Sequence, residues 1–350
     1  MTSVTRRSLS TAVVLAVGGS LALAGTATAS ATGHKGGSAS TITSASLATG
    51  LYQSSYSERN HVLWTTTAVG RPPVTDSSLL KVDPRTLKVE KTIVPPVTDA
   101  ATGAVEAVYG VAVDDEHNTV WTTNTRSNTV SVYSQKTGAH LATLPDVAHG
   151  RDIVVDEKHD TVWASSFAGA SLVAFDSKTL KEKGRVTIEG SSPTGLTLNE
   201  KTGAVYTADM NNDRVIEVAP HKAPRFIPAG DGAISVALSA NGKTAYTANQ
   251  TAGTLSVIDL KKGVVTSTVA TGNGPLAVAT DKKSGRVLVV NRTDADVTVV
   301  DPKKGAVVET LATGANPNHV TVADGVAYVV DKSGSGTDGK DLIHRIVLGH

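Results

Sequence analysis

The sequence predicts an all-β fold, a seven-bladed β-propeller of four-stranded antiparallel blades, and three observations lead to it. The first is a recurring pair of short strands joined by a polar turn, as in residues 244–249 and 254–259. Their alternation and β-branched residues favour strands, and neither strand could bury both faces alone. The second is the apolar residue that anchors the first strand of each pair, found at Trp64, Trp121, Trp163, Tyr206, Tyr246, Leu288 and Tyr328. The third is the spacing of these anchors, 57, 42, 43, 40, 42 and 40 residues, which is typical of propeller blades and not of a helical solenoid.

Each unit divides into four strands, named a to d from the channel outward. In the second unit we expect strand a at 109–113, b at 119–124, c at 129–133 and d at 140–144. The a–b and c–d connections are rich in Asp, Asn, Lys and Gly, the residues that tight turns require.

The last unit lacks a fourth strand. Its strands a, b and c are expected at 318–323, 326–331 and 342–348, after which the chain stops. An unpaired edge strand promotes aggregation. Residues 41–47 form a spare strand before the first unit, so we predict that they supply strand d of blade seven and close a single domain spanning 41–350.

The amino terminus resembles an export signal. Arg6 and Arg7 precede an apolar run at 11–25, and Ala27-Thr28-Ala29 offers a cleavage site of small residues. The paired arginines are typical of twin-arginine export, and an ordinary secretory signal is the alternative. We predict that residues 1–29 are removed, that 30–40 form a flexible leader, and that the product is secreted or otherwise extracytoplasmic.

Composition narrows the choice of partners. Without residues 1–29 the chain has 31 basic and 32 acidic residues, because only Arg6 and Arg7 are lost from the 33 and 32 of the full sequence. A nearly neutral chain with few aromatic residues lacks the basic surface and the stacking side chains that bind nucleic acid, so we do not expect a nucleic-acid partner. There are no cysteines, and no segment after the signal has the length and hydropathy of a transmembrane helix. A monomer is expected.

Two short motifs carry a family resemblance. Tyr246-Thr247-Ala248-Asn249 is followed by Leu255-Ser256-Val257-Ile258-Asp259, and Thr271-Gly272-Asn273-Gly274-Pro275 leads to the next unit. They resemble the YVTN-repeat, or YncE-like, β-propeller family over residues 41–348. The resemblance implies the fold. It implies no single activity, because relatives of this kind include binding proteins, lactonases and a metal-dependent antibiotic lyase.

Loop length distinguishes the two faces of the ring. Antiparallel blades place the d–a and b–c loops on one face and the a–b and c–d turns on the other. The three longest connections, at 68–76, 97–106 and 332–340, all fall on the d–a/b–c face, in the neighbouring blades seven, one and two. Because binding residues concentrate on loops held by a rigid scaffold, we predict the functional rim there.

The residues entering each strand a should surround the channel mouth. Aligning the units gives the pairs Tyr52-Gln53, Tyr109-Gly110, Arg151-Asp152, Thr194-Gly195, Ile234-Ser235, Leu276-Ala277 and Asn318-His319. The polar members gather in blades seven, one, two and three. The predicted binding residues are therefore Tyr52, Gln53, Tyr109, Arg151, Asp152, Asn318 and His319.

Several chemistries remain open for this sector. His319 or His149 could act as a general base, although a hydrogen-bonded structural role explains His319 as well. Arg151 could bind an anion or simply pair with Asp152. Glu106, His149 and His319 could together hold a divalent metal, but they come from separate blades and lack a short ligand spacing.

Two principal functions follow. One is an exported binding protein that holds a small molecule, a peptide or a cell-envelope partner at the channel mouth. The other is a lactonase- or lyase-type enzyme on the same face, with a histidine base and a metal cofactor as an option. A structural partner in a surface assembly is a third. The chain has no Gly-x-Ser-x-Gly elbow, phosphate-binding loop or Cys/His zinc spacing, which removes those chemistries.

Overall fold

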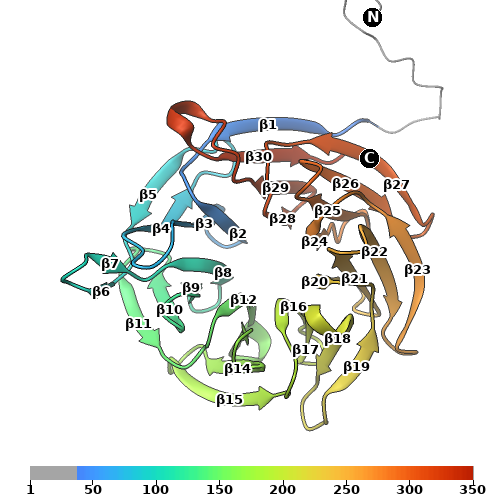
Figure 1. The fold of residues 1–350 in the computed structure, drawn as a ribbon, viewed down its shortest axis with the longest axis horizontal. Helices are drawn as coiled ribbons and strands as arrows, with labels where there is room; N and C mark the ends of the chain where they lie inside the picture. The colour runs from blue at the N-terminus through green and yellow to red at the C-terminus, as the bar shows by residue number, and fades with distance from the viewer. Residues whose placement is uncertain (1–37, 350) are drawn as a thin grey trace, which may run out of the picture. The chain divides into compact units, whose positions relative to one another are not determined.

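The computed structural model describes residues 38–349, which form a ring of seven four-stranded antiparallel sheets (Figure 1). The predicted signal, 1–29, and most of the leader, 30–40, lie outside the described residues. The blade strands, in chain order, are β2 (Leu51–Ser57), β3 (Val62–Val69), β4 (Asp76–Val82) and β5 (Val89–Ile93) in blade one; β8 (Val108–Asp114), β9 (Thr119–Asn124), β10 (Thr129–Ser134) and β11 (His140–Leu144) in blade two; β12 (Gly150–Asp156), β13 (Thr161–Ser166), β14 (Ser171–Asp176) and β15 (Lys181–Thr187) in blade three; β16 (Pro193–Asn199), β17 (Ala204–Asp209), β18 (Arg214–Val218) and β19 (Arg225–Pro228) in blade four; β20 (Ala233–Leu238), β21 (Thr244–Asn249), β22 (Thr254–Asp259) and β23 (Val264–Ala270) in blade five; β24 (Pro275–Thr280), β25 (Val287–Asn291), β26 (Asp296–Asp301) and β27 (Ala306–Ala312) in blade six; and β28 (His319–Ala323), β29 (Val326–Val330), β30 (Leu342–Val347) and β1 (Thr41–Ser46) in blade seven.

The remaining elements are small. A hairpin of β6 (Val97–Asp99) and β7 (Ala104–Val105) projects from the connection between blades one and two (Figure 1). The helices of the described part are three short 3₁₀ turns, η1 (Glu157–His159), η2 (Met210–Asn212) and η3 (Thr337–Gly339). In residues 38–349, then, no helix has the length and hydropathy needed to cross a membrane.

The amino-terminal strand closes the ring, as predicted. β1 runs antiparallel to β30, with Thr41 opposite Val347 and Ser46 opposite Leu342. Ser40 extends this closure, since its backbone N–H donates to Glu309 Oε1 at 3.0 Å and its hydroxyl accepts from Gly349 N at 3.0 Å. The last residue of the expected leader is therefore attached to the ring.

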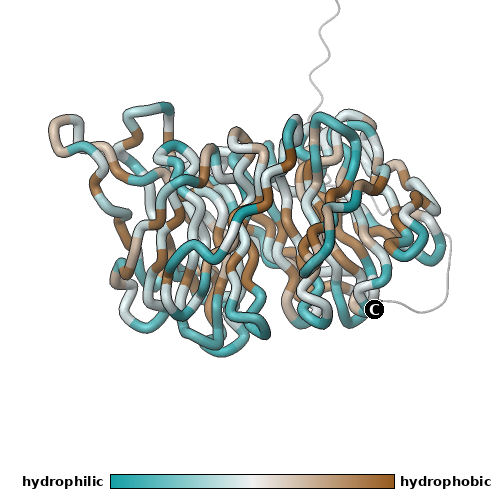
Figure 2. The backbone as a smooth tube through the Cα atoms, turned by 90° about the horizontal axis from the view of Figure 1, so that it is seen from below, coloured by the Kyte–Doolittle hydropathy of each residue, from teal (hydrophilic) through white to brown (hydrophobic). Residues whose placement is uncertain are grey.

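The core consists of apolar clusters between neighbouring blades. The strand-b anchors fill them: Trp121 packs with Phe175 of the next blade, their ring centroids 6.3 Å apart, and Trp64 shares a cluster with Tyr133. Both tryptophan side chains are fully buried. Figure 2 shows the result from the side, with apolar segments in the middle of the ring and hydrophilic loops at its two faces.

The asparagines that end several b strands stabilise the blades. Asn124 Nδ2 donates to Thr129 Oγ1 and to Ser131 Oγ, at 2.9 and 2.8 Å. Asn249 makes the same pair of bonds, at 3.0 and 2.9 Å, to Thr254 and Ser256. Each bond ties the end of strand b to strand c, so the repeat motif is a blade-building device.

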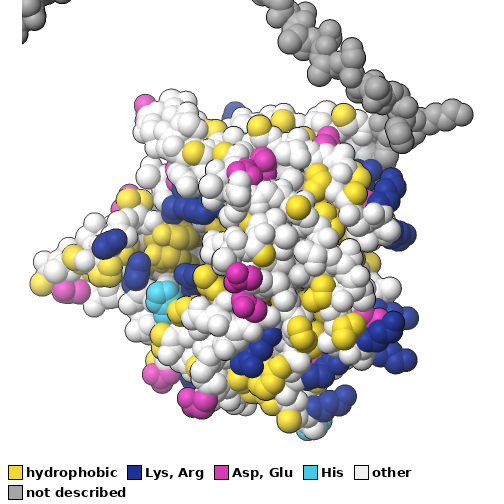
Figure 3. All heavy atoms as spheres, turned by 45° about the vertical axis from the view of Figure 1, so that its right-hand side comes forward, with side chains coloured by type: hydrophobic (Ala, Val, Ile, Leu, Met, Phe, Trp, Pro, Cys, Tyr) yellow, Lys and Arg dark blue, Asp and Glu magenta, His cyan; other side chains and the backbone are white. Residues whose placement is uncertain are grey.

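Lysines occur in the c–d turns, on the face of the ring opposite the d–a/b–c loops. In blades five and six, Lys262 and Lys304 lie 3.9 and 3.6 Å from the turn acids Asp259 and Asp301. Figure 3 shows Lys and Arg side chains along its right-hand edge, the side of the ring that holds these blades. These cations are solvated and have acidic neighbours.

Candidate functional site

The inner strands surround a cavity of about 160 Å³ at the channel mouth. All seven blades contribute the residues that were expected to enter strand a, with the exception of Gly110. Those residues are Tyr52, Gln53, Tyr109, Arg151, Asp152, Thr194, Gly195, Ile234, Ser235, Leu276, Ala277, Asn318 and His319. The structure thus brings together all seven predicted binding residues, although their binding role stays a prediction.

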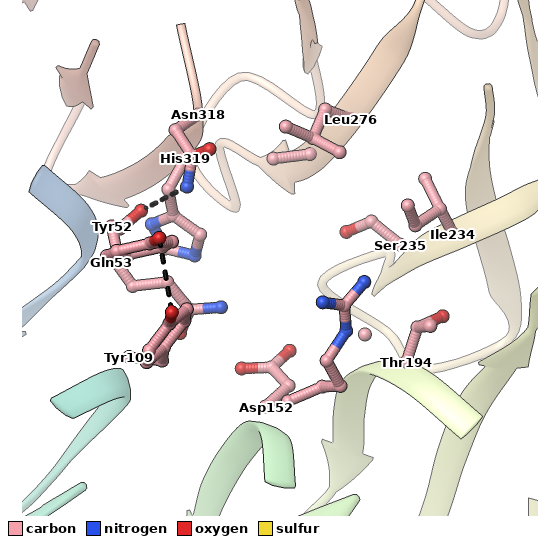
Figure 4. A pocket seen from close by; sticks show the side chains of 13 residues that line it. Tyr52, Gln53, Tyr109, Asp152, Thr194, Ile234, Ser235, Leu276, Asn318 and His319 are labelled. Carbon is pink, nitrogen blue, oxygen red and sulfur yellow. Dashed lines mark hydrogen bonds between the residues drawn. The ribbon is translucent and has the colours of Figure 1, made fainter. Parts of the chain in front are cut away.

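The cavity has two different sides (Figure 4). Tyr52, Gln53, Tyr109, Asn318 and His319 lie on one side, and Thr194, Ile234, Ser235 and Leu276 lie opposite. The first side belongs to blades seven, one and two, where the long loops lie. The polar sector expected from the sequence is therefore a physical feature of the mouth.

Four polar side chains of the mouth link neighbouring blades. Each accepts a hydrogen bond from a backbone N–H at the start of strand a in the next blade. The bonds run from Val111 to Gln53, from Leu196 to Asp152, from Val278 to Ser235 and from Ser54 to His319, at 3.3, 2.8, 3.3 and 3.3 Å. Blades one, three, five and seven supply these acceptors.

Blades two, four and six carry Gly110, Gly195 and Ala277 at the equivalent position. Small residues are needed there because the neighbouring backbone is close. A Cβ atom on Gly195 would lie 2.7 Å from Ser235 Cα, and one on Gly110 would lie 2.9 Å from the carbonyl oxygen of Arg151. Gln53, Asp152 and His319 accordingly have a structural function; it was one of the roles expected for His319, and it was not expected for Gln53 and Asp152.

This bond determines the chemistry of His319. A backbone N–H can only donate, so Nδ1 accepts and the ring proton is on Nε2. Burial lowers the pKa of His319 to about 4, which keeps the ring neutral. The atom left without a protein partner in the described structure, Nε2, is a donor. His319 is thus poorly placed as a general base, and the structural role is the one the geometry supports.

Asp152 is likewise occupied. Its Oδ2 accepts from Leu196 N at 2.8 Å and its Oδ1 from Ile153 N at 2.9 Å. Burial raises its pKa to about 6. Arg151 and Asp152, both in the described part, form no direct ion pair, and each favours the charged state of the other only through a longer-range electrostatic interaction.

A pair of tyrosines forms the centre of the polar side. The Tyr52 and Tyr109 rings lie 3.9 Å apart between centroids, tilted by 39°, and Tyr52 donates to the Tyr109 hydroxyl at 3.3 Å. Lys332 Nζ lies 3.5 Å from the centroid of the Tyr52 ring. Asn318 holds Tyr52 by donating to its carbonyl oxygen at 2.7 Å, and Arg292 donates to Asn318 Oδ1, also at 2.7 Å.

The cations beside this pair are desolvated. Burial lowers the pKa of Lys332 to about 8, and it also lowers the pKa of Arg151 and of Arg292. Within residues 38–349 neither these three side chains nor Arg126 forms an ion pair with a carboxylate. Buried charges are normally paired, but Asp341 and Asp152 act on Lys332 and Arg151 only from a longer range, so the mouth carries an excess of positive charge.

The proposed metal ligands do not converge. Glu106 accepts from the hydroxyls of Ser131 and Thr143 inside blade two. The His149 ring packs 5.6 Å from that of Phe167, while His319 faces blade one. These three residues do not form a metal site.

One other group of possible ligand atoms occurs among the described residues. It consists of Glu116, His117 and Asp160, on the a–b turns of the opposite face. Lys178 already binds Asp160 at 2.7 Å, and His117 binds Asp114 at 2.9 Å. These contacts explain the group as a network of hydrogen bonds and ion pairs between neighbouring turns.

The sequence placed Lys332 in the long loop 332–340 of this face, but Lys332, Arg292 and Arg126 were not among the predicted binding residues. All three lie on b–c loops, outside the strand-a alignment. Lys332 contacts the Tyr52 ring, Arg292 bonds to Asn318, and Arg126 acts on Tyr52 through its charge. A basic residue just after strand b in blades two, six and seven was the signal available.

These features define the class, a seven-bladed β-propeller closed by its amino-terminal strand. No protein-family profile matches the chain. Two similar proteins are the uncharacterized proteins YncE of Escherichia coli O157:H7 and of Salmonella typhimurium, each 25% identical over 231 residues. Each match covers 61% of this chain and 63% of the relative, so the chain spans less than two thirds of the relative's length. The chain is a distant homologue of YncE and a YncE-like propeller.

Solved structures share the fold. A streptogramin B lyase has a TM-score of 0.69 at 13% identity, with 88% of this chain and 97% of that one covered. Virginiamycin B lyase from Staphylococcus aureus has a TM-score of 0.71 at 13% identity, with 88% and 99% covered. At this identity the likeness concerns the fold alone.

Proposed function

We propose that the chain is an exported binding protein that holds a small ligand at the channel mouth, on the d–a/b–c face. The observation that carries the proposal is the one-sided mouth: a cavity of about 160 Å³ whose lining includes a tyrosine pair and Arg151, with the desolvated Lys332 against the Tyr52 ring. Such an arrangement costs stability in the free protein. Ligand-binding sites commonly keep such arrangements although they lower the stability of the free protein.

The packing contacts that fix the two tyrosines support the proposal. Tyr52 and Tyr109 pack against a small apolar cluster of Ala68, Val74 and Ala107, which belongs to the long connections of blades one and two. Val105 N donates to Val74 O at 2.9 Å and joins those two connections. The long loops therefore hold the tyrosine pair in place, as is required of side chains that contact a ligand.

Export rests on the sequence. Arg6 and Arg7 ahead of the apolar run support translocation, and they predict that the protein accumulates outside the cytoplasm. Fractionation of cells making the chain tests this, with Arg6→Lys/Arg7→Lys as the variant. Retention of that variant inside the cell would indicate the twin-arginine route, and equal export of both chains would favour the ordinary secretory route.

A lyase-type activity is the second candidate, and His149 is the residue that favours it. Its ring makes no hydrogen bond within the described residues, and burial together with Arg151 and Arg126 lowers its pKa. A neutral imidazole with a free nitrogen can accept a proton. The solved propellers of similar fold include two named as lyases, which makes the comparison relevant without deciding it.

The binding test uses Leu276, which lines the wall opposite the tyrosines. The purified protein is equilibrated with culture filtrate and washed, and retained small molecules are identified by mass spectrometry. Wild type and Leu276→Met should retain a compound that the mouth-narrowing Leu276→Trp loses, with all three melting alike. Equal retention by all three, or none by wild type, would contradict the proposal.

The same samples test the second candidate. If wild type converts the retained compound and His149→Ala retains it unchanged, the protein is an enzyme. If both retain it unchanged, it is a binding protein.

A further inference from the structure

We propose that the ligand of the mouth is a small organic anion whose carboxylate or phosphate group meets the Tyr109 hydroxyl among the surrounding cations. This inference rests on the proposed function, and it names the chemical class of the ligand. It follows from charge, from hydrogen-bonding capacity and from size.

The first step is the charge around the tyrosine pair. Lys332 lies on the face of Tyr52, and Arg292 is anchored one hydrogen bond away through Asn318. Arg126 and Arg292 act electrostatically on the Tyr52 hydroxyl, and Arg151 is within electrostatic range of both tyrosines. One cation, Lys332, therefore contacts the tyrosine pair, and three more act on it through their charge.

The second step is that the nearby acids offset only part of this positive charge. Asp341, the acid that acts on Lys332, accepts from the backbone N–H groups of Gly50 at 2.6 Å and Gly334 at 2.9 Å. The Asp152 oxygens are taken by Leu196 N and Ile153 N. Asp341 and Asp152 are two charges against four cations, so an anion from outside would supply the missing countercharge.

The third step is a free donor at the centre of this group. Tyr52 uses its hydroxyl hydrogen on the Tyr109 oxygen. In the described structure the hydrogen of Tyr109 has no acceptor. It can therefore donate to a ligand oxygen, and the cations nearby would strengthen that bond.

The fourth step is size. The cavity of about 160 Å³ is close to the roughly 150 Å³ that holds one benzene molecule in an engineered cavity. A one-ring carboxylate or phosphate ester fits this space, with the ring toward Leu276 and Ile234 and the charged group toward the tyrosines. A polymer or a folded partner does not fit it.

Calorimetric titration of the full mature chain tests the inference with three matched probes: benzoate, phenyl phosphate and the neutral benzyl alcohol. We expect at least one anion to bind, and benzyl alcohol to bind about tenfold more weakly or not at all, because a charged hydrogen-bonding group is lost. Comparing benzoate with phenyl phosphate decides between the two anionic groups. Benzyl alcohol binding as tightly as both anions would overturn the inference.

Variants locate the binding. Lys332→Met, Arg151→Met and Tyr109→Phe should each weaken the anion about tenfold, whereas Lys262→Met on the opposite face should leave its affinity unchanged. Thermal melting of each variant checks that the fold is intact. Equal affinity in wild type and in the three mouth variants would show that the anion binds elsewhere, and the inference would fail.

This failure is distinguishable from failure of the proposed function. If a compound is retained in the mouth, is lost in Leu276→Trp and proves to be neutral or cationic, the binding function stands and the anionic class is wrong. If nothing is retained and no probe binds, both are wrong.

Discussion

The Nδ1 atom of His319 accepts a hydrogen bond from the backbone N–H of Ser54 at 3.3 Å, and this bond joins the last blade of the ring to the first. It belongs to a series in which Gln53, Asp152 and Ser235 do the same for the blades that follow them. The channel wall is therefore held together by side chains that also line the mouth. If the mouth binds a ligand as proposed, substitutions at these positions would change both stability and binding, and the predictions below separate the two effects.

The first prediction concerns acid stability. The pKa of His319 is lowered from 6.5 to about 4 in the folded protein. Between these values the unfolded chain binds a proton that the folded chain does not, so the free energy of unfolding falls as the pH drops from about 6.5 to about 4. The loss can reach about 3 kcal/mol. Urea titrations across this pH range measure it.

Asp152 acts with the opposite sign, since its pKa is raised from 3.8 to about 6. In that window the folded chain binds the extra proton, and stability rises as the pH falls. The matched variant His319→Gln isolates the histidine, because glutamine does not titrate and Asp152 is unchanged. The difference between wild type and His319→Gln should depend on pH. A constant difference from pH 7 to pH 4 would refute the assignment.

The second prediction concerns the small residues between blades. Gly195→Ala would place a Cβ atom 2.7 Å from Ser235 Cα and 3.0 Å from Ile234 O. Both are backbone atoms that cannot easily move, so we expect a loss of about 1–3 kcal/mol in unfolding free energy. Gly184→Ala, where no atom lies within 4 Å, is the control and should be neutral. Equal melting of the two variants would count against the close approach.

The third prediction concerns ring closure. A protein starting at residue 50 lacks β1 and Leu47, which is buried between blades seven and one. Loss of a buried leucine alone costs about 2–5 kcal/mol, and β30 would gain an open edge. Its melting midpoint should fall well below that of a protein starting at residue 30. Matching midpoints would mean that the amino-terminal strand does not close the ring.

The fourth prediction concerns the folding stability that is lost by burying the charge of Lys332. The pKa of Lys332 is lowered from 10.5 to about 8 by burial, so its charge is unfavourable in the free protein at neutral pH. We expect Lys332→Met to raise the unfolding free energy by about 1 kcal/mol while it weakens anion binding. The gain should shrink as the pH rises from about 8 to 10.5, because in this window the folded chain has released the proton, and with it the buried charge, while the unfolded chain still holds it. A variant that is less stable than wild type at pH 7 would contradict this.

Much of the fold could be predicted from the sequence. Anchors such as Trp121 and Tyr246 repeat near 40 residues, and the missing last strand pointed to residues 41–47. Local sequence patterns determine the strands of each blade. Because each blade must bury its faces against two neighbours, the number of repeats gives the number of blades, and the ring has to close. The mouth residues were predictable for the same reason, because aligned strands start at the same radius.

The roles of those residues were predictable only in part, since a structural role was one of two that the sequence left open for His319. Whether His319 accepts a bond from blade one or faces a ligand depends on the distance between blades, which no local pattern encodes. Lys332 reaches Tyr52 from a long loop whose path is set by tertiary contacts. The hairpin β6–β7 was expected only as a long connection, since its strands have three and two residues.

The most direct measurement is a crystal of the mature chain grown with 4-bromobenzoate, in which the anomalous signal of bromine locates the ligand. We predict one bromine peak in the mouth, on the side of Leu276 and Ile234, with the carboxylate against the Tyr109 hydroxyl. A peak confined to the opposite face, or a mouth that stays free of ligand at saturating concentration, would contradict the account.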